Sequence, residues 1–330
     1  MKAGYAYGIG SGVAWGLSGV VIGIAVGKYP FAAAPSLLAA PLAAAALTDG
    51  LRTCWQVGQL AATHRLRGLP AALRTRHAGF AMLAALAGGP LATSCYFVAL
   101  VYSGITYAYA LSAMAPALGA LLAAAFLRER LPARAWSGML LIIAGTVVVS
   151  FRPPEDASPH FYLGLLFALG AAVGWAFEGL FAAKAMERLD AAVANLVRQA
   201  LSLAVFLALL LPLVPGAYGV FVRAFDSLSL IIFVAGTAVS AGGYLLYFTA
   251  LGKIGPGRAM PINLTYVLWA ALFSLLLTGT KPSWQLLFGA AAVVAGTPLV
   301  VLERRSRREA SAPQAAADQL PPCEERQTGE

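Results

Sequence analysis

The residues best suited to bind a solute are polar or aromatic side chains set within long apolar segments. They recur at spacings of three or four, which place them on one face of a helix. Similar side chains return at matched positions in the second half of the chain. A polar group inside lipid costs free energy unless it meets a cavity or a partner, so we expect these faces to line one central cavity. The residues predicted to bind substrate are Trp15, Ser18, Tyr96, Ser112, Trp175, Glu178, Tyr244, Tyr247, Asn263 and Tyr266.

Glu178 carries the most specific chemical hypothesis. It is the only carboxylate that we expect at membrane depth, and we expect no Lys, Arg or His clearly within a span. We predict that Glu178 either titrates during transport or contacts the ammonium group of a substrate. The alternative interpretation is a structural acid, hydrogen-bonded to neighbouring helices or placed near a cytoplasmic exit.

The aromatic members of this set could stack on a flat apolar or aromatic side chain. Trp and Tyr also anchor helices at the membrane interface, and for Tyr102, Tyr107 and Tyr109, near the outer end of their spans, this interpretation is at least equal. Trp15 and Trp175 fall roughly at mid-span, where an interfacial role does not apply. We therefore predict that these two tryptophans line the cavity.

Four residues are predicted as hinges, namely Pro90, Pro116, Gly242 and Gly243. Pro116 lacks a backbone donor and would crowd the carbonyl of Ser112, leaving an acceptor beside the Ser112 hydroxyl. The Gly88-Gly89-Pro90 and Gly242-Gly243 sites are expected to let their helices bend. Ordinary packing is the alternative, because Pro and Gly are common in membrane helices, and the Gly12–Gly16 spacing favours close helix contact.

The composition indicates a membrane protein. Hydrophobic residues make up 60% of the chain and charged residues 11%, with a mean hydropathy of +0.76. A soluble fold of 330 residues could not cover so much apolar surface. The net charge of +9 lies mostly at helix ends, which argues against nucleic-acid binding. Cys54, Cys95 and Cys323 are too few and too scattered for a disulfide framework or a metal site, and no cofactor is expected.

Apolar runs of about 20 residues predict an all-α membrane protein with ten transmembrane helices. The second span is interrupted by Thr48-Asp49-Gly50, whereas the second, fifth, seventh and tenth are otherwise nearly pure Ala, Leu and Val and are expected to face lipid or scaffold. Residues 303–330 are expected to form a disordered cytoplasmic tail. The predicted spans are 4–26, 32–54, 78–101, 105–127, 134–151, 161–183, 192–214, 228–251, 257–278 and 284–302.

The Lys and Arg distribution predicts the orientation. With both termini in the cytoplasm, nineteen basic residues lie inside and four outside. Cytoplasmic loops carry such an excess of Lys and Arg. We therefore expect a multi-pass protein with both termini cytoplasmic.

The chain is also an internal duplication. A shift of 151 residues pairs Tyr96 with Tyr247 and Gly145 with Gly296, and a shift of 160 pairs Trp15 with Trp175. Residues 1–151 and 152–302 are thus predicted as two five-helix repeats. Because five is odd, the two copies must cross the membrane in opposite directions, as in the inverted repeats of secondary transporters, where substrate binds between the halves.

The repeat resembles a known family. Its first copy carries Pro116, Leu127, Glu129, Leu131, Gly138 and Gly145, and this pattern is similar to the EamA repeat of the drug/metabolite transporter superfamily. The second copy departs from it, with Gly279-Thr280-Lys281 in place of Arg128-Glu129-Arg130. Among members, the AWGLSGV opening and the aromatic core look most like the YddG-type amino-acid exporters. The resemblance implies export of aromatic and other neutral amino acids across a bacterial inner membrane.

Three other classes of protein, namely enzymes, ATP-driven pumps and channels, fit the sequence less well than a secondary transporter. An enzyme would need a catalytic constellation, yet His64, His77 and His160 fall in predicted loops, and no HExxH or GxSxG occurs. A GxxxxGK[ST] motif for an ATP-driven pump is missing from the sequence, and rings of charge typical of a channel are not visible. The leading prediction is alternating-access export of a small neutral amino acid or related metabolite by a monomer. The alternative is efflux of drugs or lipophilic cations, with Glu178 as the proton or cation site.

Overall fold

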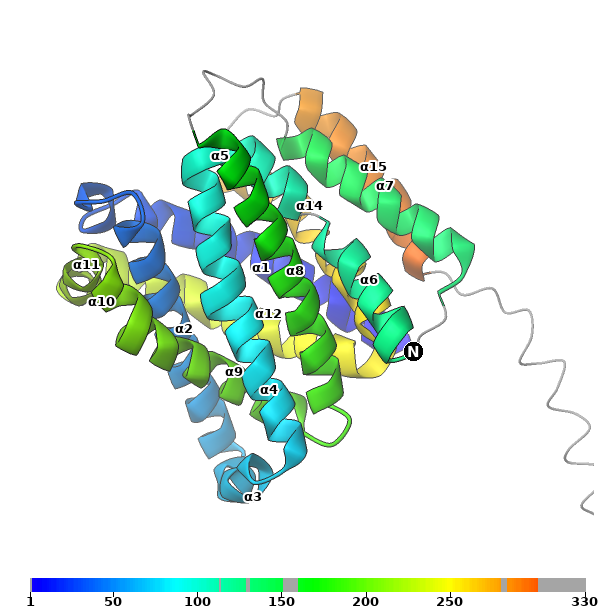
Figure 1. Cartoon of the computed structure of the whole chain (residues 1–330), viewed down its shortest axis with the longest axis horizontal. Coiled ribbons are helices and arrows are strands. Elements are labelled where there is room, and N and C mark those ends of the chain that lie inside the picture. The colour runs from blue at the N-terminus through cyan, green and yellow to red at the C-terminus, as the bar shows by residue number, and fades with distance from the viewer. Residues whose placement is uncertain (1, 113, 129–130, 151–159, 280–283, 302–330) are drawn as a thin grey trace, which may run out of the picture.

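The computed structural model describes residues 2–112, 114–128, 131–150, 160–279 and 284–301, and these residues are helical apart from short connections (Figure 1). The predicted tail, 303–330, lies outside the described residues. Residues 1–150 contribute the following elements, of which η3 is π-helical: α1 (Lys2–Val26), η1 (Phe31–Ala33), α2 (Ala39–Ala62), η2 (Arg65–Gly68), α3 (Leu69–Leu73), α4 (Arg76–Leu86), η3 (Ala87–Thr93), α5 (Ser94–Ser112), α6 (Ala115–Phe126) and α7 (Ala133–Ser150).

The second half repeats this pattern, with a π-helical segment η4 that continues α9. A short surface helix, α11, precedes the long α12. The elements of this half are α8 (Phe161–Ala185), α9 (Ala191–Val205), η4 (Phe206–Leu210), α10 (Leu211–Leu213), α11 (Ala217–Ala224), α12 (Leu228–Ile254), α13 (Pro256–Asn263), α14 (Tyr266–Thr278) and α15 (Trp284–Val301).

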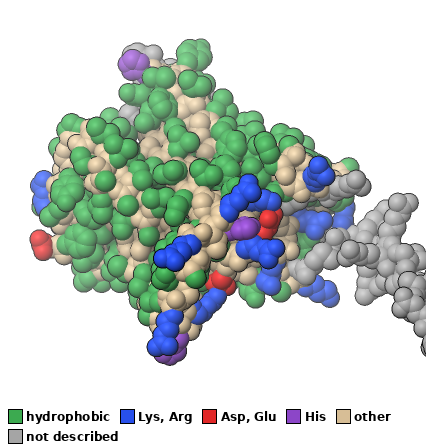
Figure 2. Space-filling model, turned by 60° about the horizontal axis from the view of Figure 1, so that its bottom comes forward, with side chains coloured by type: hydrophobic (Ala, Val, Ile, Leu, Met, Phe, Trp, Pro, Cys, Tyr) green, Lys and Arg blue, Asp and Glu red, His purple; other side chains and the backbone are tan. Residues whose placement is uncertain are grey.

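Six helical runs are long and apolar enough to cross a membrane, among the residues that the structure describes. Large apolar side chains such as Leu140, Leu166, Leu276 and Phe288 lie exposed on the surface. Figure 2 shows this broadly hydrophobic exterior, with the basic side chains gathered over part of the face in view. An exterior of this kind needs lipid around it. The six runs are Lys2–Val26, Arg76–Ala99, Phe161–Ala185, Ala191–Leu213, Leu228–Ile254 and Pro256–Thr278.

The two halves pack crosswise. Helix α1 of the first half lies along α12 and α14 of the second, and α8 of the second half lies along α5 and α6 of the first. The pairs α2–α9 and α7–α15 join equivalent helices of the two halves, and α7 and α15 run side by side at one edge of the bundle (Figure 1). The long helices therefore pack chiefly against partners from the other half, and neither half builds the core alone.

Several helix boundaries differ from the predicted spans. The second helix begins at Ala39 rather than at residue 32, because Phe31–Ala33 form a separate 3-10 turn, and it continues to Ala62. Helical residues also continue across the predicted boundary between the third and fourth spans as far as Ser112. Pro116 lies in the first turn of α6, so it starts a helix and does not kink one. The helix is interrupted just before Pro116, since α5 ends at Ser112 and α6 begins at Ala115, and the predicted crowding of the Ser112 carbonyl stays a prediction.

Close approach between helices depends on glycines that lack a Cβ. At Gly16 in α1, an added Cβ would lie 2.5 Å from the Trp269 Cβ and 2.7 Å from the Ala270 backbone nitrogen of α14. At Gly12, it would lie 2.6 Å from the Thr265 hydroxyl oxygen. The packing interpretation of the Gly12–Gly16 spacing is therefore confirmed.

The close contact at Gly16 predicts that a larger residue at this position lowers the stability of the protein. Gly16→Ala must push α1 away from the α14 backbone, and overpacking of this kind costs about 1–3 kcal/mol. We expect a lower thermal unfolding temperature in detergent, followed by tryptophan fluorescence. Gly23→Ala on the same helix is the control, because no atom lies within 4 Å of a Cβ built there. Equal unfolding temperatures for the two variants would contradict the close α1–α14 contact.

Candidate functional site

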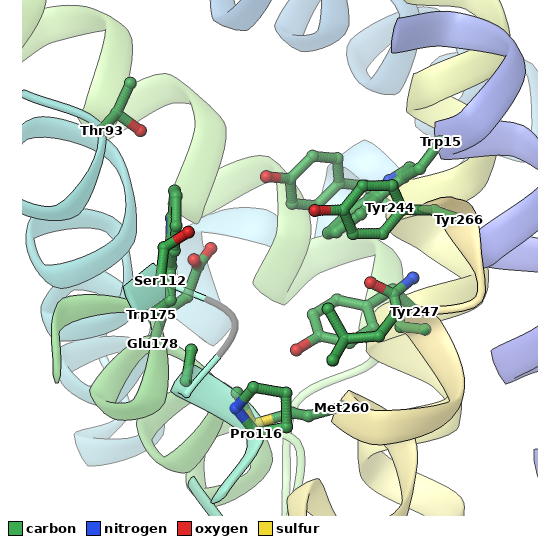
Figure 3. Close-up of a pocket in the computed structure, with 13 residues that line it drawn as sticks. Trp15, Thr93, Ser112, Pro116, Trp175, Glu178, Tyr244, Tyr247, Met260 and Tyr266 are labelled. Carbon is green, nitrogen blue, oxygen red and sulfur yellow. The ribbon is translucent and has the colours of Figure 1, made fainter. Parts of the chain in front are cut away.

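A cavity of about 250 Å³ lies between two walls of helices near the middle of the bundle (Figure 3). One wall presents Trp15, Tyr244, Tyr247 and Tyr266, from α1, α12 and α14. The opposite wall presents Trp175 and Glu178 from α8, together with Ser112 and Thr93, while Pro116 and Met260 close one end. Eight of the ten predicted binding residues thus line this cavity, namely Trp15, Ser112, Trp175, Glu178, Tyr244, Tyr247, Asn263 and Tyr266.

Aromatic rings pack against one another around the cavity. The Trp15 ring centroid lies 4.8 Å from that of Tyr244, 5.2 Å from Tyr247 and 6.3 Å from Tyr266. Gly243 lets the indole approach α12, because a Cβ there would lie 2.7 Å from Trp15 Cδ1. Tilted and edge-on arrangements of this kind hold the rings in place while leaving a face open. The cavity is therefore a largely aromatic box.

The two remaining predicted residues lie just outside this box. Tyr96 stands behind Trp175, with ring centroids 5.5 Å apart, and so supports one wall. Ser18 is buried and lines the adjoining cavity described below. Asn263 borders the box and donates a hydrogen bond of 2.7 Å to Ser11 Oγ on α1.

Glu178 has charged partners, contrary to the sequence-based expectation. Arg198 Nε on α9 donates a hydrogen bond of 2.8 Å to Glu178 Oε1. The same guanidinium reaches a second buried carboxylate, since Nη1 lies 3.4 Å from Asp49 Oδ1 on α2. The predictions that Glu178 is the only carboxylate at this depth, and that no basic residue joins it, are therefore wrong.

Asp49 is held by further groups. Ser202 Oγ donates to Asp49 Oδ2 at 2.6 Å, and Arg52 Nη1 lies 3.6 Å from Asp49 Oδ1. Arg52 Nε in turn donates to Ser240 Oγ at 2.6 Å. Burial of charge is tolerated where each charge is paired and hydrogen-bonded. We name Asp49, Arg52, Glu178 and Arg198 the charge cluster; it contains two carboxylates and two guanidinium groups.

Tyr244 lies between the two arginines of the charge cluster and the aromatic box. Its ring lines the box, and the guanidinium carbons of Arg52 and Arg198 lie 4.7 and 4.8 Å from its centroid. Neither arginine lines the box itself. Among the described lining residues, the box therefore offers one carboxylate, several π-faces and no basic side chain.

The helices of spans two and seven carry this chemistry, although they were predicted to face lipid or scaffold. They bury Asp49 and Arg198, and also a line of amides in which Asn195 donates to Gln56 Oε1 at 2.9 Å and Gln199 donates to Asn195 at 2.9 Å. Arg52 and Arg198 were among the nineteen basic residues assigned to the cytoplasmic side. Without these two, seventeen basic residues are assigned to the cytoplasmic side and four to the outer side, so the excess of basic residues on the cytoplasmic side remains.

The predicted hinge at Gly88-Gly89-Pro90 forms the π-helical segment η3. A Cβ at Gly88 would overlap the Glu178 carboxylate, and one at Gly89 would overlap the Ser202 hydroxyl. The Thr93 hydroxyl donates to the Gly88 carbonyl at 3.1 Å. These glycines therefore make room for the charge cluster. Gly242 and Gly243 lie within the continuous helix α12.

A second cavity, of about 410 Å³, adjoins the aromatic box. The two share Trp15, Thr93, Tyr244 and Tyr266. The second cavity extends along α1 and α2 toward Val26 and Pro41, and its wall includes Asp49, Arg52 and Arg198. Within the described part of the chain, no group of three His, Cys, Asp or Glu side chains could hold a metal ion.

The model of the EamA-like transporter family matches residues 2–151 and again residues 162–302. The chain belongs to this family and contains two EamA repeats. It is thus a multi-pass membrane protein of a transporter family within the drug/metabolite transporter superfamily.

Individual relatives are distant. Protein LicB of Haemophilus influenzae is 25% identical over 189 residues, a match that covers 57% of this chain and 63% of LicB. A solved crystal structure of a protein superposes with a TM-score of 0.70 and 19% identity, over 91% of this chain and 97% of the other. At this identity the superposition establishes the shared fold alone.

Proposed function

We propose that this protein is a secondary transporter that carries a small organic ammonium compound through the aromatic box. The lining of the box supports this substrate class, because its described residues combine Trp and Tyr faces with the single carboxylate of Glu178 and no basic side chain. Aromatic faces attract quaternary and other organic ammonium ions, most strongly where water is excluded. A cavity of about 250 Å³ suits a small solute.

Transport is proposed to proceed by alternating access between two five-helix repeats of opposite orientation. The doubled family match and the crosswise packing support this arrangement. Inverted-repeat transporters place their substrate at the interface of the repeats, and the two walls of the box draw on both halves. We further propose a monomer in a bacterial inner membrane with cytoplasmic termini, supported by the bias of basic residues.

Export of neutral amino acids is the second candidate. The observation that favours it is the adjoining cavity, whose wall carries Arg52 and Arg198 next to the shared residue Tyr244. An aromatic amino acid could place its ammonium near Glu178 and its carboxylate toward these arginines. Because both guanidinium groups already face carboxylates, we rank this candidate below a cation.

The test is binding and flux with the full chain. Purified protein in detergent would be titrated with tetramethylammonium, choline, phenylalanine and tryptophan, and labelled choline and phenylalanine would be followed in liposomes. We expect saturable binding and flux of an ammonium ion without a carboxylate. Amino-acid flux that the ammonium ions do not inhibit would overturn the cation proposal and favour the second candidate.

Trp15 provides the matched variant for this test. Trp15→Ala removes the ring that contacts three tyrosines of the box, and loss of a desolvated cation–π contact of about 2 kcal/mol weakens binding roughly tenfold or more. Trp284→Ala is the control, since Trp284 is 74% exposed on α15. Equal affinities of the two variants for tetramethylammonium would exclude Trp15 from the binding site.

A further inference from the structure

We propose that Arg198 and Asp49 set the affinity of the site for its substrate by an exchange of ion-pair partners. Without substrate, Arg198 is paired with Glu178. A substrate ammonium displaces Arg198 from Glu178, and the displaced guanidinium then pairs with Asp49. This inference rests on the proposed function, because it requires that the substrate carries a positive charge. It concerns two residues outside the lining of the aromatic box.

The geometry places Arg198 between two acceptors. Its side chain is 3% exposed, and its guanidinium lies 2.8 Å from Glu178 Oε1 through Nε and 3.4 Å from Asp49 Oδ1 through Nη1. The shorter contact joins it to Glu178, which also faces the box (Figure 3). A substrate ammonium and Arg198 therefore compete for one carboxylate. The guanidinium can leave Glu178 without becoming unpaired, because Asp49 is already within reach.

The net charge of the charge cluster determines whether a substitution in it strengthens or weakens the binding of an ammonium ion. Asp49 and Glu178 balance Arg52 and Arg198, so an added cation meets a neutral cluster. Removing Arg198 leaves one excess negative charge and frees Glu178. Removing the charge of Asp49 leaves one excess positive charge, and Arg198 then has Glu178 as its remaining carboxylate among the described residues. Charges this close interact strongly in a buried site.

The exchange would also connect substrate binding to the packing of the two halves. Asp49 lies on α2 of the first half, whereas Glu178 and Arg198 lie on α8 and α9 of the second. The Arg198–Asp49 contact is therefore an ion pair between halves, and α2 and α9 pack together. A substrate that shifts Arg198 toward Asp49 strengthens this contact between halves. Arg198 therefore positions two things, the Glu178 carboxylate and the α2–α9 helix pair.

The experiment compares two charge-neutralising variants of opposite predicted effect. Binding of tetramethylammonium would be measured by titration calorimetry on the full chain, with flux in liposomes. We expect Arg198→Gln to bind at least tenfold more tightly than wild type, with a lower KM and a lower kcat because release is slowed. We expect Asp49→Asn to bind at least tenfold more weakly. A purely structural role would weaken binding in both variants, and that result would overturn the proposal.

Controls separate this outcome from misfolding and from failure of the proposed function. Asp49→Asn/Arg198→Gln keeps the charge sum at zero, and we expect it to bind more tightly than Asp49→Asn alone; equal or weaker binding would overturn the exchange. Arg65→Gln, which breaks the half-exposed Arg65–Asp190 pair, should leave affinity unchanged. If wild type binds no ammonium ion, the proposed function fails first. If wild type binds and Arg198→Gln weakens binding, only the exchange fails.

Discussion

Glu178→Gln should weaken binding of an ammonium substrate by at least 30-fold and nearly abolish its flux. The amide keeps the size of the side chain but removes the only negative charge among the described residues that line the box. Loss of one partner from a buried charge pair costs about 2–5 kcal/mol, which corresponds to roughly 30-fold or more in affinity. The aromatic faces alone supply about 0.5–2 kcal/mol, so they do not replace the carboxylate.

Titration calorimetry with tetramethylammonium and choline flux in liposomes would measure this effect. Glu178→Asp is the matched control, because it keeps the negative charge but shortens the side chain by one methylene. We expect its affinity to lie between those of wild type and Glu178→Gln. Flux under a pH gradient would test the proton hypothesis separately. A variant Glu178→Gln that transports like wild type at every pH would rule out both cation binding and proton coupling by this side chain.

Much of the aromatic box could be predicted from the sequence because its signals are local. A side chain three or four residues from another lies on the same helical face wherever the helix packs. Trp15, Trp175 and Tyr244 were therefore identified from spacing and from their recurrence in the two copies. The duplication could be recognised because matching residues recur at a nearly constant shift along the chain. The family model, which matches the chain twice, confirms it.

The charge cluster was missed because ion pairing is a tertiary property. An arginine near a span end looks the same in sequence whether it faces the cytoplasm or a carboxylate from another helix. Arg52 and Arg198 were counted among the basic residues of the cytoplasmic side, and Asp49 was interpreted as an interruption of an apolar span. A signal was present, since Asp49, Arg52 and Gln56 share one helical face of α2.

That shared face also explains why α2 differs from its predicted span. The polar residues are buried against α9 and α12, so the helix continues to Ala62 instead of ending where the apolar run ends. The same reasoning applies to the predicted hinge in η3. Sequence shows that glycine occurs there, but only the packing shows that the missing side chains leave room for Glu178 and Ser202.

Gly88→Ala should therefore impair the site almost as much as Glu178→Gln. A Cβ at Gly88 would overlap Oε2 and Cδ of the Glu178 carboxylate, whose other oxygen is held by Arg198. The carboxylate must then leave the ion pair, or the π-helical segment must shift away from α8. Either movement takes the negative charge from the place where it faces the box, so we expect at least tenfold weaker binding of tetramethylammonium.

Gly79→Ala, in the same helical run, is the matched control, because nothing lies within 4 Å of a Cβ built there. Alanine favours the helix over glycine by about 1 kcal/mol, so this variant should be at least as stable as wild type and bind equally well. Gly88→Ala should unfold at a lower temperature and bind weakly. If Gly88→Ala bound as tightly as Gly79→Ala, the position of Glu178 against η3 would not control the affinity of the site.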